Sequence, residues 1–316
     1  MPAFDVAGLG LNATDTLVLA PRFPAYAGKE PFEREILSPG GQVATAMAAC
    51  ARLGLRAKYI GTVGDDERGR IQLQSLREAG VDTEHVFVRE GCSSQSAYIV
   101  VDRSTGERTV LWRRPECLRL SEEDITPEMV LNARLLHIDG HDTPAVARAA
   151  EIARARGIPV TVDVDTPYEG FERVLASADY LIASSEFPRA WTGEQDPFKA
   201  LEAIQNEYGM RLAGMTLGAN GALARAEGRF FYSPAFVVDA VDTTGAGDVF
   251  HGAFCYAVLK GMPIREALDF SNAMAALNCT ALGARGGLAT AAQAAALMAR
   301  AGRRSDAAFK SRAASA

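Results

Sequence analysis

The second half of the chain alternates between short apolar runs and amphipathic stretches, and this alternation limits the possible folds more than any other feature. A short apolar run bounded by turn residues predicts a buried β-strand, and apolar residues spaced three or four apart predict a helix. Strands that alternate with helices form βαβ units, whose strands pair in parallel and whose helices cover both faces of the sheet. We therefore predict an α/β fold with a mostly parallel sheet between two helical layers. The predicted elements are strands at Phe4–Leu9, Ala57–Val63, Arg134–Ile138, Pro159–Asp163, Tyr180–Ala183 and Arg211–Leu217, helices at Gly41–Gly54, Glu67–Ala79, Pro144–Arg156, Gly170–Ala176 and Pro197–Tyr208, and a hairpin through Gly228.

Two segments of the first half do not follow this alternation. Thr16–Leu37 has strand-like patches broken by proline and glycine, and Ser96–Trp112 has two apolar runs around the polar turn Arg103–Gly106, which predicts a β-hairpin. We predict that these segments, at about residues 13–38 and 94–114, form a separate small sheet interleaved with a single domain of residues 1–302. An active-site lid and a dimer interface are equally good uses for such a sheet. The polar segment 303–316 is expected to be a flexible tail.

The composition narrows the class of protein. The 316 residues are 48% hydrophobic and 23% charged, as in an ordinary globular domain. The first residues lack the pattern of a secretion signal, and no apolar run approaches the roughly 20 residues of a membrane helix. A net charge of −6 argues against nucleic-acid binding. Because the five cysteines form no CxxC pair, we expect reduced thiols in a cytoplasmic protein; they are Cys50, Cys92, Cys117, Cys255 and Cys279.

The most informative segment is the string Asp242-Thr243-Thr244-Gly245-Ala246-Gly247-Asp248, followed by a long apolar helix that ends at Gly261. The glycines stand at the helix N-terminus, where unsatisfied N–H groups and the helix dipole favour an anion. A carboxylate in the first turn, at Asp248, can accept the proton of an attacking hydroxyl group. A general base, a positioned acceptor and charge stabilisation are what phosphoryl transfer requires of a protein. An aspartate that merely caps a helix after a glycine turn would explain a shorter motif equally well, but not the whole string.

This string resembles the second signature of the PfkB, or ribokinase-like, family of carbohydrate kinases. The resemblance implies a ribokinase-like α/β/α fold and an ATP-dependent kinase that uses Mg²⁺. It implies that Asp248 is the general base and that the backbone amides of Gly245, Ala246 and Gly247 form an anion hole. It also places Asp242 and Thr244 near the site for a monovalent cation, such as K⁺, that many members use; such sites consist largely of backbone carbonyls.

A second segment resembles the first signature of the same family. It runs from Pro39 through Gly40 and Gly41 to Gly54, and continues with Gly61–Asp66. The resemblance implies that the Gly40-Gly41 turn brings backbone amides against the sugar. The chain has Thr45 where the family usually has asparagine, so a substrate contact at that position is in doubt. A mobile turn before a helix would explain the glycines alone.

Shorter matches extend the resemblance along the chain. Asn12 and Asp15 follow the first strand, where family members hold sugar hydroxyls, although a lone aspartate in a loop is usually just solvated. Glu186 stands at the position of a glutamate that organises Mg²⁺ through water, and it could equally be a charge at a helix start. Residues that match the family's nucleotide-binding loops are Thr216, Gly218, Gly221, Asn272 and the segment Gly283–Gly287.

Basic residues in the predicted small sheet suggest which acceptor the protein uses. Lys29, Arg113 and Arg114 could clamp an anionic group, because guanidinium groups match carboxylates, phosphates and sulfonates. They could equally solvate an exposed strand end. With the string Ser93–Ala97, the chain resembles most the ketohexokinase-like and sulfofructose-kinase-like branch, which implies a ketohexose or an acidic keto-sugar. A metal site is conceivable in the sequence after the strand Arg134–Ile138, but structural or substrate-lining roles fit it better; its residues are His137, Asp139, His141 and Asp142.

Three other functions compete with a sugar kinase. A nucleoside kinase of the same family would need an aromatic slot for a base, and the predicted small sheet offers Trp112. A sugar-binding or regulatory protein without activity would tolerate loss of Asp248, which is present. A dehydrogenase is excluded because Gly8-Leu9-Gly10 lacks the third glycine and the helix start of a dinucleotide-binding motif.

Overall fold

The computed structural model describes residues 2–304 and 306–315, and a nine-stranded sheet forms its centre. The strand order is β13-β12-β11-β10-β9-β8-β1-β4-β5. All neighbouring pairs from β11 to β5 are parallel, and β12 and β13 add an antiparallel hairpin at one edge. The bounds are β1 Val6–Leu9, β4 Ala57–Gly64, β5 Val86–Arg89, β8 Leu136–Ile138, β9 Val160–Val164, β10 Tyr180–Ala183, β11 Leu212–Thr216, β12 Ala222–Ala226 and β13 Arg229–Ser233.

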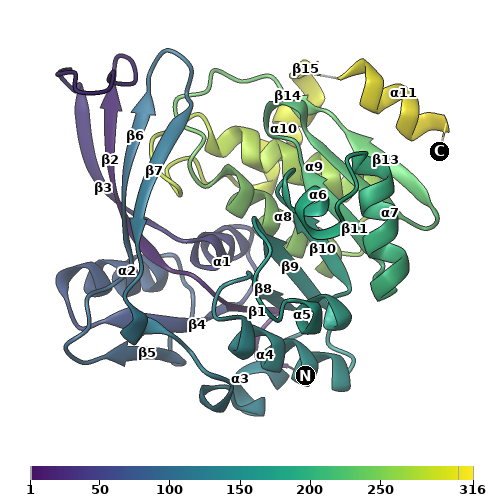
Figure 1. Cartoon of the computed structure of the whole chain (residues 1–316), viewed down its shortest axis with the longest axis horizontal. Coiled ribbons are helices and arrows are strands. Elements are labelled where there is room, and N and C mark those ends of the chain that lie inside the picture. Colours follow the sequence, from purple (N-terminus) through teal and green to yellow (C-terminus); the bar gives the residue numbers. More distant parts are fainter. Residues whose placement is uncertain (1, 305, 316) are drawn as a thin grey trace.

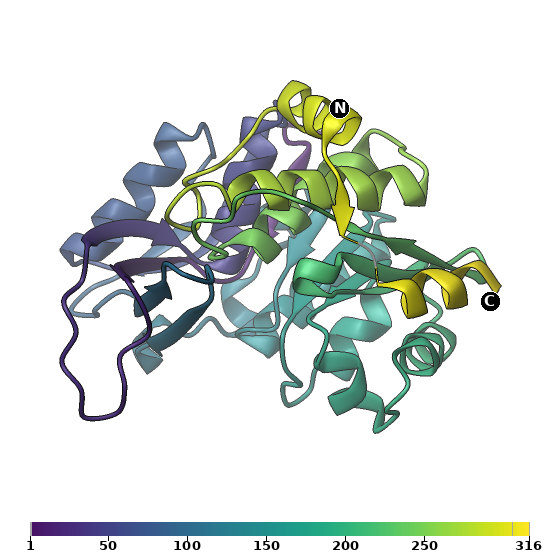
Figure 2. The same ribbon diagram turned by 90° about the horizontal axis from the view of Figure 1, so that it is seen from above.

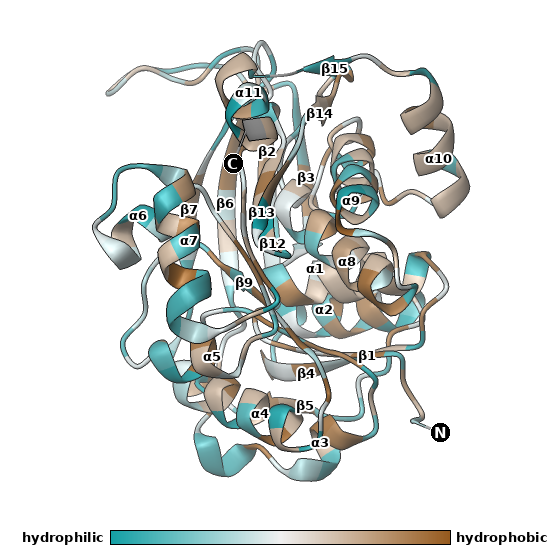
Figure 3. Ribbon diagram, turned by 90° about the vertical axis from the view of Figure 1, so that its right-hand side faces the viewer, coloured by the Kyte–Doolittle hydropathy of each residue, from teal (hydrophilic) through white to brown (hydrophobic). Residues whose placement is uncertain are grey.

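Helices cover both faces of this sheet (Figure 3). Helices α3 to α7 pack on one face, while α1, α2, α8 and α9 pack on the other, with α10 outside α9. The predicted fold class is thereby confirmed. The helix bounds are α1 Gln42–Arg52, α2 Glu67–Glu78, α3 Pro127–Leu131, α4 Thr143–Ala155, α5 Glu172–Ser177, α6 Phe187–Thr192, α7 Pro197–Tyr208, α8 Ala246–Leu259, α9 Ile264–Asn278, α10 Ala291–Arg300 and α11 Ala307–Ser315, with short 3-10 turns at Glu116–Leu118, Glu122–Asp124 and Gly218–Asn220.

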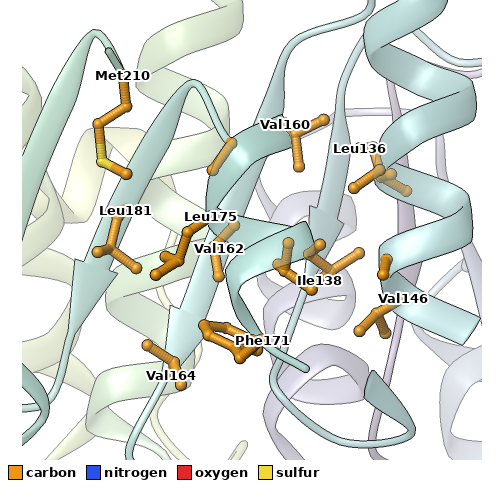
Figure 4. Packing of buried hydrophobic residues seen from close by; sticks show 14 of the residues in the cluster. Leu136, Ile138, Val146, Val160, Val162, Val164, Phe171, Leu175, Leu181 and Met210 are labelled. Atoms are coloured by element: carbon orange, nitrogen blue, oxygen red, sulfur yellow. The ribbon is translucent and has the colours of Figure 1, made fainter. Parts of the chain in front are cut away.

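Alternation along the strands divides the core into two layers. In β9, Val160, Val162 and Val164 point toward α4 and α5 and pack in the largest hydrophobic cluster (Figure 4). Each such side chain contributes roughly 2 kcal/mol when it is removed from water. The intervening residues Thr161 and Asp163 belong to the opposite face, toward α8. The alternation that buries the valines on one face therefore also places the carboxylate of Asp163 on the face toward α8.

Four more strands form the predicted small sheet, which stands beside the main sheet (Figures 1 and 2). Its order is β3-β2-β6-β7, with β2 and β6 parallel and the other two pairs antiparallel. One face packs Leu17, Ile99 and Val101 against the protein, and the opposite face exposes Leu37 and Leu111. The bounds are β2 Ala13–Ala20, β3 Arg34–Gly40, β6 Ser96–Asp102 and β7 Arg108–Arg113.

The segment predicted to be a flexible tail has regular structure in the residues described. The two-residue strand β15, Arg303–Arg304, pairs with β14, Ala235–Phe236. In α11, the ring of Phe309 stacks on Phe198 and Tyr232. The prediction missed this because a short helix with one large apolar side chain gives almost no periodic signal. Residues 305 and 316 of the predicted tail lie outside the described residues.

Cys92 and Cys117 form a disulfide, so the prediction of reduced thiols is wrong for these two residues. They are 25 residues apart in sequence, but the β6–β7 hairpin between them brings their Cα atoms to 6.1 Å. That separation suits a disulfide and follows from the fold rather than from cysteine spacing. Cys50, Cys255 and Cys279 are free and buried. Among residues 2–304 and 306–315, none of the helices combines the length and the apolar character that a membrane crossing requires.

Candidate active site

A cleft of about 760 Å³ opens between the small sheet and the carboxyl ends of the main-sheet strands. Ligands bind at this edge in open parallel sheets because loops and helix N-termini converge there. The lining residues come from distant segments of the chain, including the β1–β2 region, β7, the end of β9 and the start of α8. The polar and charged ones are Asp15, Gln42, Gln95, Arg108, His141, Asp163, Asp165, Thr166, Tyr168, Ser184, Thr216, Thr244, Asp248 and His251.

The loop before α8 is held rigidly by buried hydrogen bonds. Asp242 accepts the backbone N–H of Thr244 and that of Gly283, each at 2.8 Å. The amide of Asn278 donates to the carbonyls of Thr244 and Ala284. Asp242 therefore supports the loop with both carboxylate oxygens, and it does not line the cleft.

Glycine is required at position 245. Its φ of 75° favours glycine, and an added Cβ would lie 2.3 Å from the carbonyl oxygen of Ala284. Gly247 has open space around the position of a Cβ, so a ligand can approach the backbone at the first turn of α8. Both glycines line the cleft. The positive end of the α8 dipole is thus accessible to an anion, as the sequence predicts.

Asp248 faces the cleft from the first turn of α8. Surrounding protein desolvates its carboxylate, and this effect, reinforced by Asp163 and Asp15, raises its pKa to about 7 in spite of the opposing charges of His251 and Arg108. A carboxyl group with a pKa near neutrality is well matched to accepting a proton at neutral pH.

Asp15, which lines the cleft, lies against Gly40. A Cβ at Gly40 would lie 2.1 Å from an oxygen of Asp15, so only glycine leaves room for this carboxylate. Asp15 is 5% exposed, and burial raises its pKa to about 6 although Arg285 acts in the opposite direction. Gly41 lines the cleft beside Leu11 and Ala13.

Asn12 and Thr45 do not line the cleft. Asn12 is buried, and neither polar atom of its amide has a hydrogen-bond partner among residues 2–304 and 306–315. Thr45 is fully buried and accepts a hydrogen bond from Nε of Arg285, which also donates to the carbonyl of Gly40. Arg285, which the sequence analysis missed, therefore fixes the turn before α1 from a loop more than 200 residues away.

The predicted nucleotide-binding residues are only partly brought together. Thr216 lines the cleft, and Gly218 and Gly221 follow it with positive φ angles. Asn272 does not line the cleft and donates to the carbonyl and hydroxyl oxygens of Ser233. Glu186 lies two residues after the cleft residue Ser184; its side chain is 68% exposed and forms an ion pair with Arg189.

The cation that reaches the cleft is not among those predicted. Lys29 lies in the exposed β2–β3 loop and Arg113 is exposed; neither lines the cleft. Arg114 forms an ion pair with Asp142 at 2.5 Å. Arg108 lines the cleft instead and donates to the hydroxyl of Thr243, at 2.9 Å. The alternation of side chains along β7 could have pointed to Arg108, because Arg108, Val110 and Trp112 share the face that lines the cleft.

The His and Asp residues in and after β8 have structural and lining roles, and within the described part of the chain they form no common metal-binding group. Asp139 is buried and accepts the backbone N–H groups of Leu11 and His141. His137 is fully buried against Thr161. His141 lines the cleft next to Tyr168, whose hydroxyl lies 3.1 Å from Nε2 of His141. A second hollow, of about 600 Å³, adjoins the cleft behind Trp112, His141 and Tyr168.

Two further residues that the sequence analysis missed form an ion pair in the cleft. Nε2 of His251 lies 3.1 Å from Oδ1 of Asp163, and both side chains are almost fully buried. Asp163 lies between Val162 and Val164 of β9, and His251 lies one helical turn after Asp248. The cleft thus combines a helix N-terminus for an anion with several carboxylates for hydroxyl groups.

Comparison with known proteins identifies relatives of the whole chain. A family model described as pfkB family carbohydrate kinase matches residues 28–291. An ATP-dependent ribose-1-phosphate kinase of Halopiger xanaduensis is 30% identical over 273 residues, which are 86% of this chain and 90% of that protein.

Solved structures agree with this match. A crystal structure from Agrobacterium tumefaciens, of a protein provisionally assigned as a ribokinase, superposes with a TM-score of 0.87 at 29% identity, covering 94% of this chain and 97% of the other. A protein from E. coli, provisionally assigned as ribokinase II and solved with ATP and Mg²⁺, superposes with a TM-score of 0.82 at 23% identity, covering 94% and 99%.

Proposed function

The chain belongs to the pfkB family of carbohydrate kinases, and on that premise we propose that it transfers the γ-phosphoryl group of ATP to a hydroxymethyl oxygen of a sugar. In this proposal Asp248 is the general base, and the amides of Gly245–Gly247 are the anion hole. One observation carries the proposal: the carboxylate of Asp248 and the open backbone of Gly247 face the same cleft from the first turn of α8.

The chemistry follows from these positions. Asp248 accepts the proton of the hydroxyl group as its oxygen attacks phosphorus. Charge that develops on the transferred group lies at the positive end of α8, where preorganised N–H groups stabilise it. Asp15, at the floor of the acceptor side, can accept hydrogen bonds from sugar hydroxyls.

Oxygen ligands suit the Mg²⁺ that accompanies ATP, and the residues present fit this ion. When bound, Mg²⁺ neutralises charge on the phosphates. Glu186, exposed beside Ser184, would reach it through water. A monovalent cation fits Asp242 less well, because both oxygens of this carboxylate already accept backbone N–H groups. We assign Asp242, with Thr244, to holding the loop.

The cleft favours a neutral acceptor over an acidic one. Four carboxylates line it against two cationic side chains, Arg108 and His251, and this excess of negative charge disfavours an anionic acceptor; the carboxylates are Asp15, Asp163, Asp165 and Asp248. None of the cations that suggested an acidic keto-sugar lines the cleft, and Arg114 is paired with Asp142; these cations are Lys29, Arg113 and Arg114. A neutral sugar with several hydroxyl groups, such as a ketohexose, is therefore our first candidate.

A nucleoside is the second candidate acceptor. Trp112, His141 and Tyr168 form an aromatic wall between the cleft and the second hollow, with ring centroids 6.5 Å and 5.1 Å apart for the two neighbouring pairs. Aromatic walls bind the faces of bases. A sugar-binding protein without activity is disfavoured because Asp248 and the glycines are intact.

The test is ADP release from Mg-ATP with a panel of ketoses, aldoses, ribose 1-phosphate, sugar acids and nucleosides, with and without K⁺. We expect one acceptor to raise turnover far above the ATPase background.

Asp248→Asn should fold normally and reduce kcat by about 10³-fold or more with a modest change in KM. Glu84→Gln, an exposed carboxylate outside the cleft, is the matched control. Near-normal turnover of Asp248→Asn would contradict the assignment, and thermal-shift binding of an acceptor without turnover would support the binding protein.

We also propose that a second copy of the chain binds the outward face of the small sheet. Leu37, Tyr98 and Leu111 are each at least half exposed there. Exposed apolar patches of this kind mark interaction surfaces. In a two-fold dimer, such a face can pack against the same face of a second copy. Sedimentation should give a dimer for the wild type and a monomer for Leu111→Lys; a wild-type monomer at micromolar concentration would oppose the proposal.

A further inference from the structure

The pair formed by Asp163 and His251 lies within the proposed site but outside every motif that the sequence analysis used. The two side chains are 10% and 5% exposed, and their nearest atoms are 3.1 Å apart. Asp163 belongs to β9 and His251 to α8, so the pair joins the sheet to the helix that carries Asp248. Figure 1 shows β9 and α8 as neighbours. Because both residues line the cleft, the pair also faces a bound acceptor.

The surroundings favour the charged form of this pair. Burial acts against a charged imidazole, but the carboxylate of Asp163 outweighs it and raises the pKa of His251. Burial likewise opposes the ionised form of Asp163, and His251 reverses this and lowers the pKa of that carboxyl group. The ring of His137 stacks on His251, with centroids 5.6 Å apart, and is itself hydrogen-bonded to Thr161. The imidazole is therefore held in place, and its surroundings favour the charged form.

The charged groups that face Asp248 come from five elements. Asp163 from β9 and Asp15 from β2 oppose its ionisation. His251 from α8 itself, Arg108 from β7 and Arg285 from the loop after α9 favour it. Of the three cations, Arg108 belongs to the exposed strand β7 of the small sheet, and Arg285 donates hydrogen bonds to Thr45 and to the carbonyl of Gly40. His251 is the cation that the helix of Asp248 itself holds in place.

We propose that the Asp163–His251 ion pair is a positioning device for the base: Asp163 holds an imidazolium one helical turn from Asp248, and the positive charge of this ring favours the ionised form of Asp248 against the carboxylates of the cleft, Asp163 among them. This proposal rests on the proposed function, in which Asp248 is the general base. His251 acts through Asp248 and is a positioning residue.

A purely structural role for the pair has a different signature. If the pair only joins α8 to β9, its loss lowers stability and reduces kcat/KM by the same factor at every pH. If it sets the charge of Asp248, its loss moves the acid limb of the pH profile. The direction is fixed: removing a positive charge beside a carboxylate favours the protonated form, raises the pKa of the base and confines activity to higher pH.

The experiment is the dependence of kcat/KM on pH between about pH 5.5 and 9.5 for the wild type and His251→Gln. Glutamine keeps an N–H donor for Asp163 and removes the charge. We expect the acid limb to move up by about one pH unit, so that kcat/KM falls about fivefold at pH 7, approaches a tenfold loss at lower pH and recovers at high pH. His141→Gln, which removes the other histidine of the cleft, should leave the limb at its wild-type position. A loss in His251→Gln that is equal at every pH would overturn the proposal.

A measurement on the unaltered protein covers the case in which His251→Gln does not fold. The chain has four histidines, so the ¹⁵N resonances of their rings can be followed by NMR during a pH titration. We expect the ring of His251 to remain an imidazolium through pH 7. A neutral ring at that pH overturns the proposal. Normal turnover of Asp248→Asn, by contrast, would refute the proposed function. It would not change the charge state of His251 that the NMR titration measures, so the two failures can be told apart.

Discussion

The two walls of the cleft are held in place in different ways. The core wall, at the start of α8, is fixed by buried hydrogen bonds and by backbone so closely packed that Gly245 admits no side chain. The wall formed by the small sheet is the edge strand β7, whose residues are all exposed, Trp112 among them at 63%. Under the proposed function, the chemistry that depends on geometry would lie on the rigid wall, and the contacts that select an acceptor would lie on the adaptable one.

The β6–β7 hairpin of the small sheet is tied to the rest of the protein at both of its ends. At one end of the β6–β7 hairpin, the disulfide Cys92–Cys117 and the ion pair Arg114–Asp142 anchor the chain. At the other, the turn contacts the loop before α8, where Thr243 donates to the carbonyl of Gly106. Between these anchors β7 has a partner strand on one side only. Such an arrangement can close over a ligand, which is consistent with a lid.

Among the variants that test the two walls, Gly245→Ala in the core wall should lower kcat the most. The methyl group would meet the carbonyl of Ala284 at 2.3 Å, so the loop must shift and the anion hole opens. We expect kcat to fall about 100-fold or more, with a small change in acceptor KM. Gly261→Ala is a matched control, because Gly261 has a similar φ of 66° but open space for a Cβ. Comparable kcat values for the two variants would show that the core wall is not rigid.

Arg108→Gln tests the opposite wall and should have a smaller effect. It removes the cation that the small sheet presents to the cleft, together with the contact to Thr243. We expect the acceptor KM to rise about tenfold and kcat to change less, when both are measured at about pH 8.5, where Asp248 is ionised in either protein. Arg113→Gln, on the same strand but outside the cleft, is the control. A fall in kcat as large as that of Gly245→Ala would mean that the two walls act as one unit.

The core wall could be predicted from the sequence because its parts are local. A glycine turn, a helix start and a carboxylate in the first turn must be neighbours in the chain to be neighbours in space, so Asp248 stands in a recognisable string. The fold was predictable for a related reason, since burial on both faces of a parallel sheet imposes the alternation of strands and helices.

The other residues of the site meet only through the fold. Asp163 and His251 are 88 positions apart, and Arg285 reaches Thr45 from 240 positions away. Thr45 illustrates the limit: the family's motif left a substrate contact in doubt at this position, and only the fold shows that the hydroxyl of Thr45 accepts from Arg285 in the core. The valine alternation of β9 could have pointed Asp163 toward α8, but only once the face covered by α8 was known.

Loss of the Cys92–Cys117 disulfide should have the smallest effect on kcat. It tests whether the attachment of the β6–β7 hairpin affects the reaction at Asp248. The bond closes a loop of 25 residues that contains the whole β6–β7 hairpin, so in the chain-entropy view its loss destabilises the protein by about 3 kcal/mol. Because Arg114–Asp142 still anchors the hairpin, we expect Cys117→Ser to raise acceptor KM about threefold and to leave kcat nearly unchanged. Reducing the wild type with a dithiol should reproduce both effects, and the same dithiol should do nothing further to Cys117→Ser. If reduction instead lowers kcat, the anchors of the small sheet set the geometry at Asp248, and the division between a rigid and an adaptable wall fails.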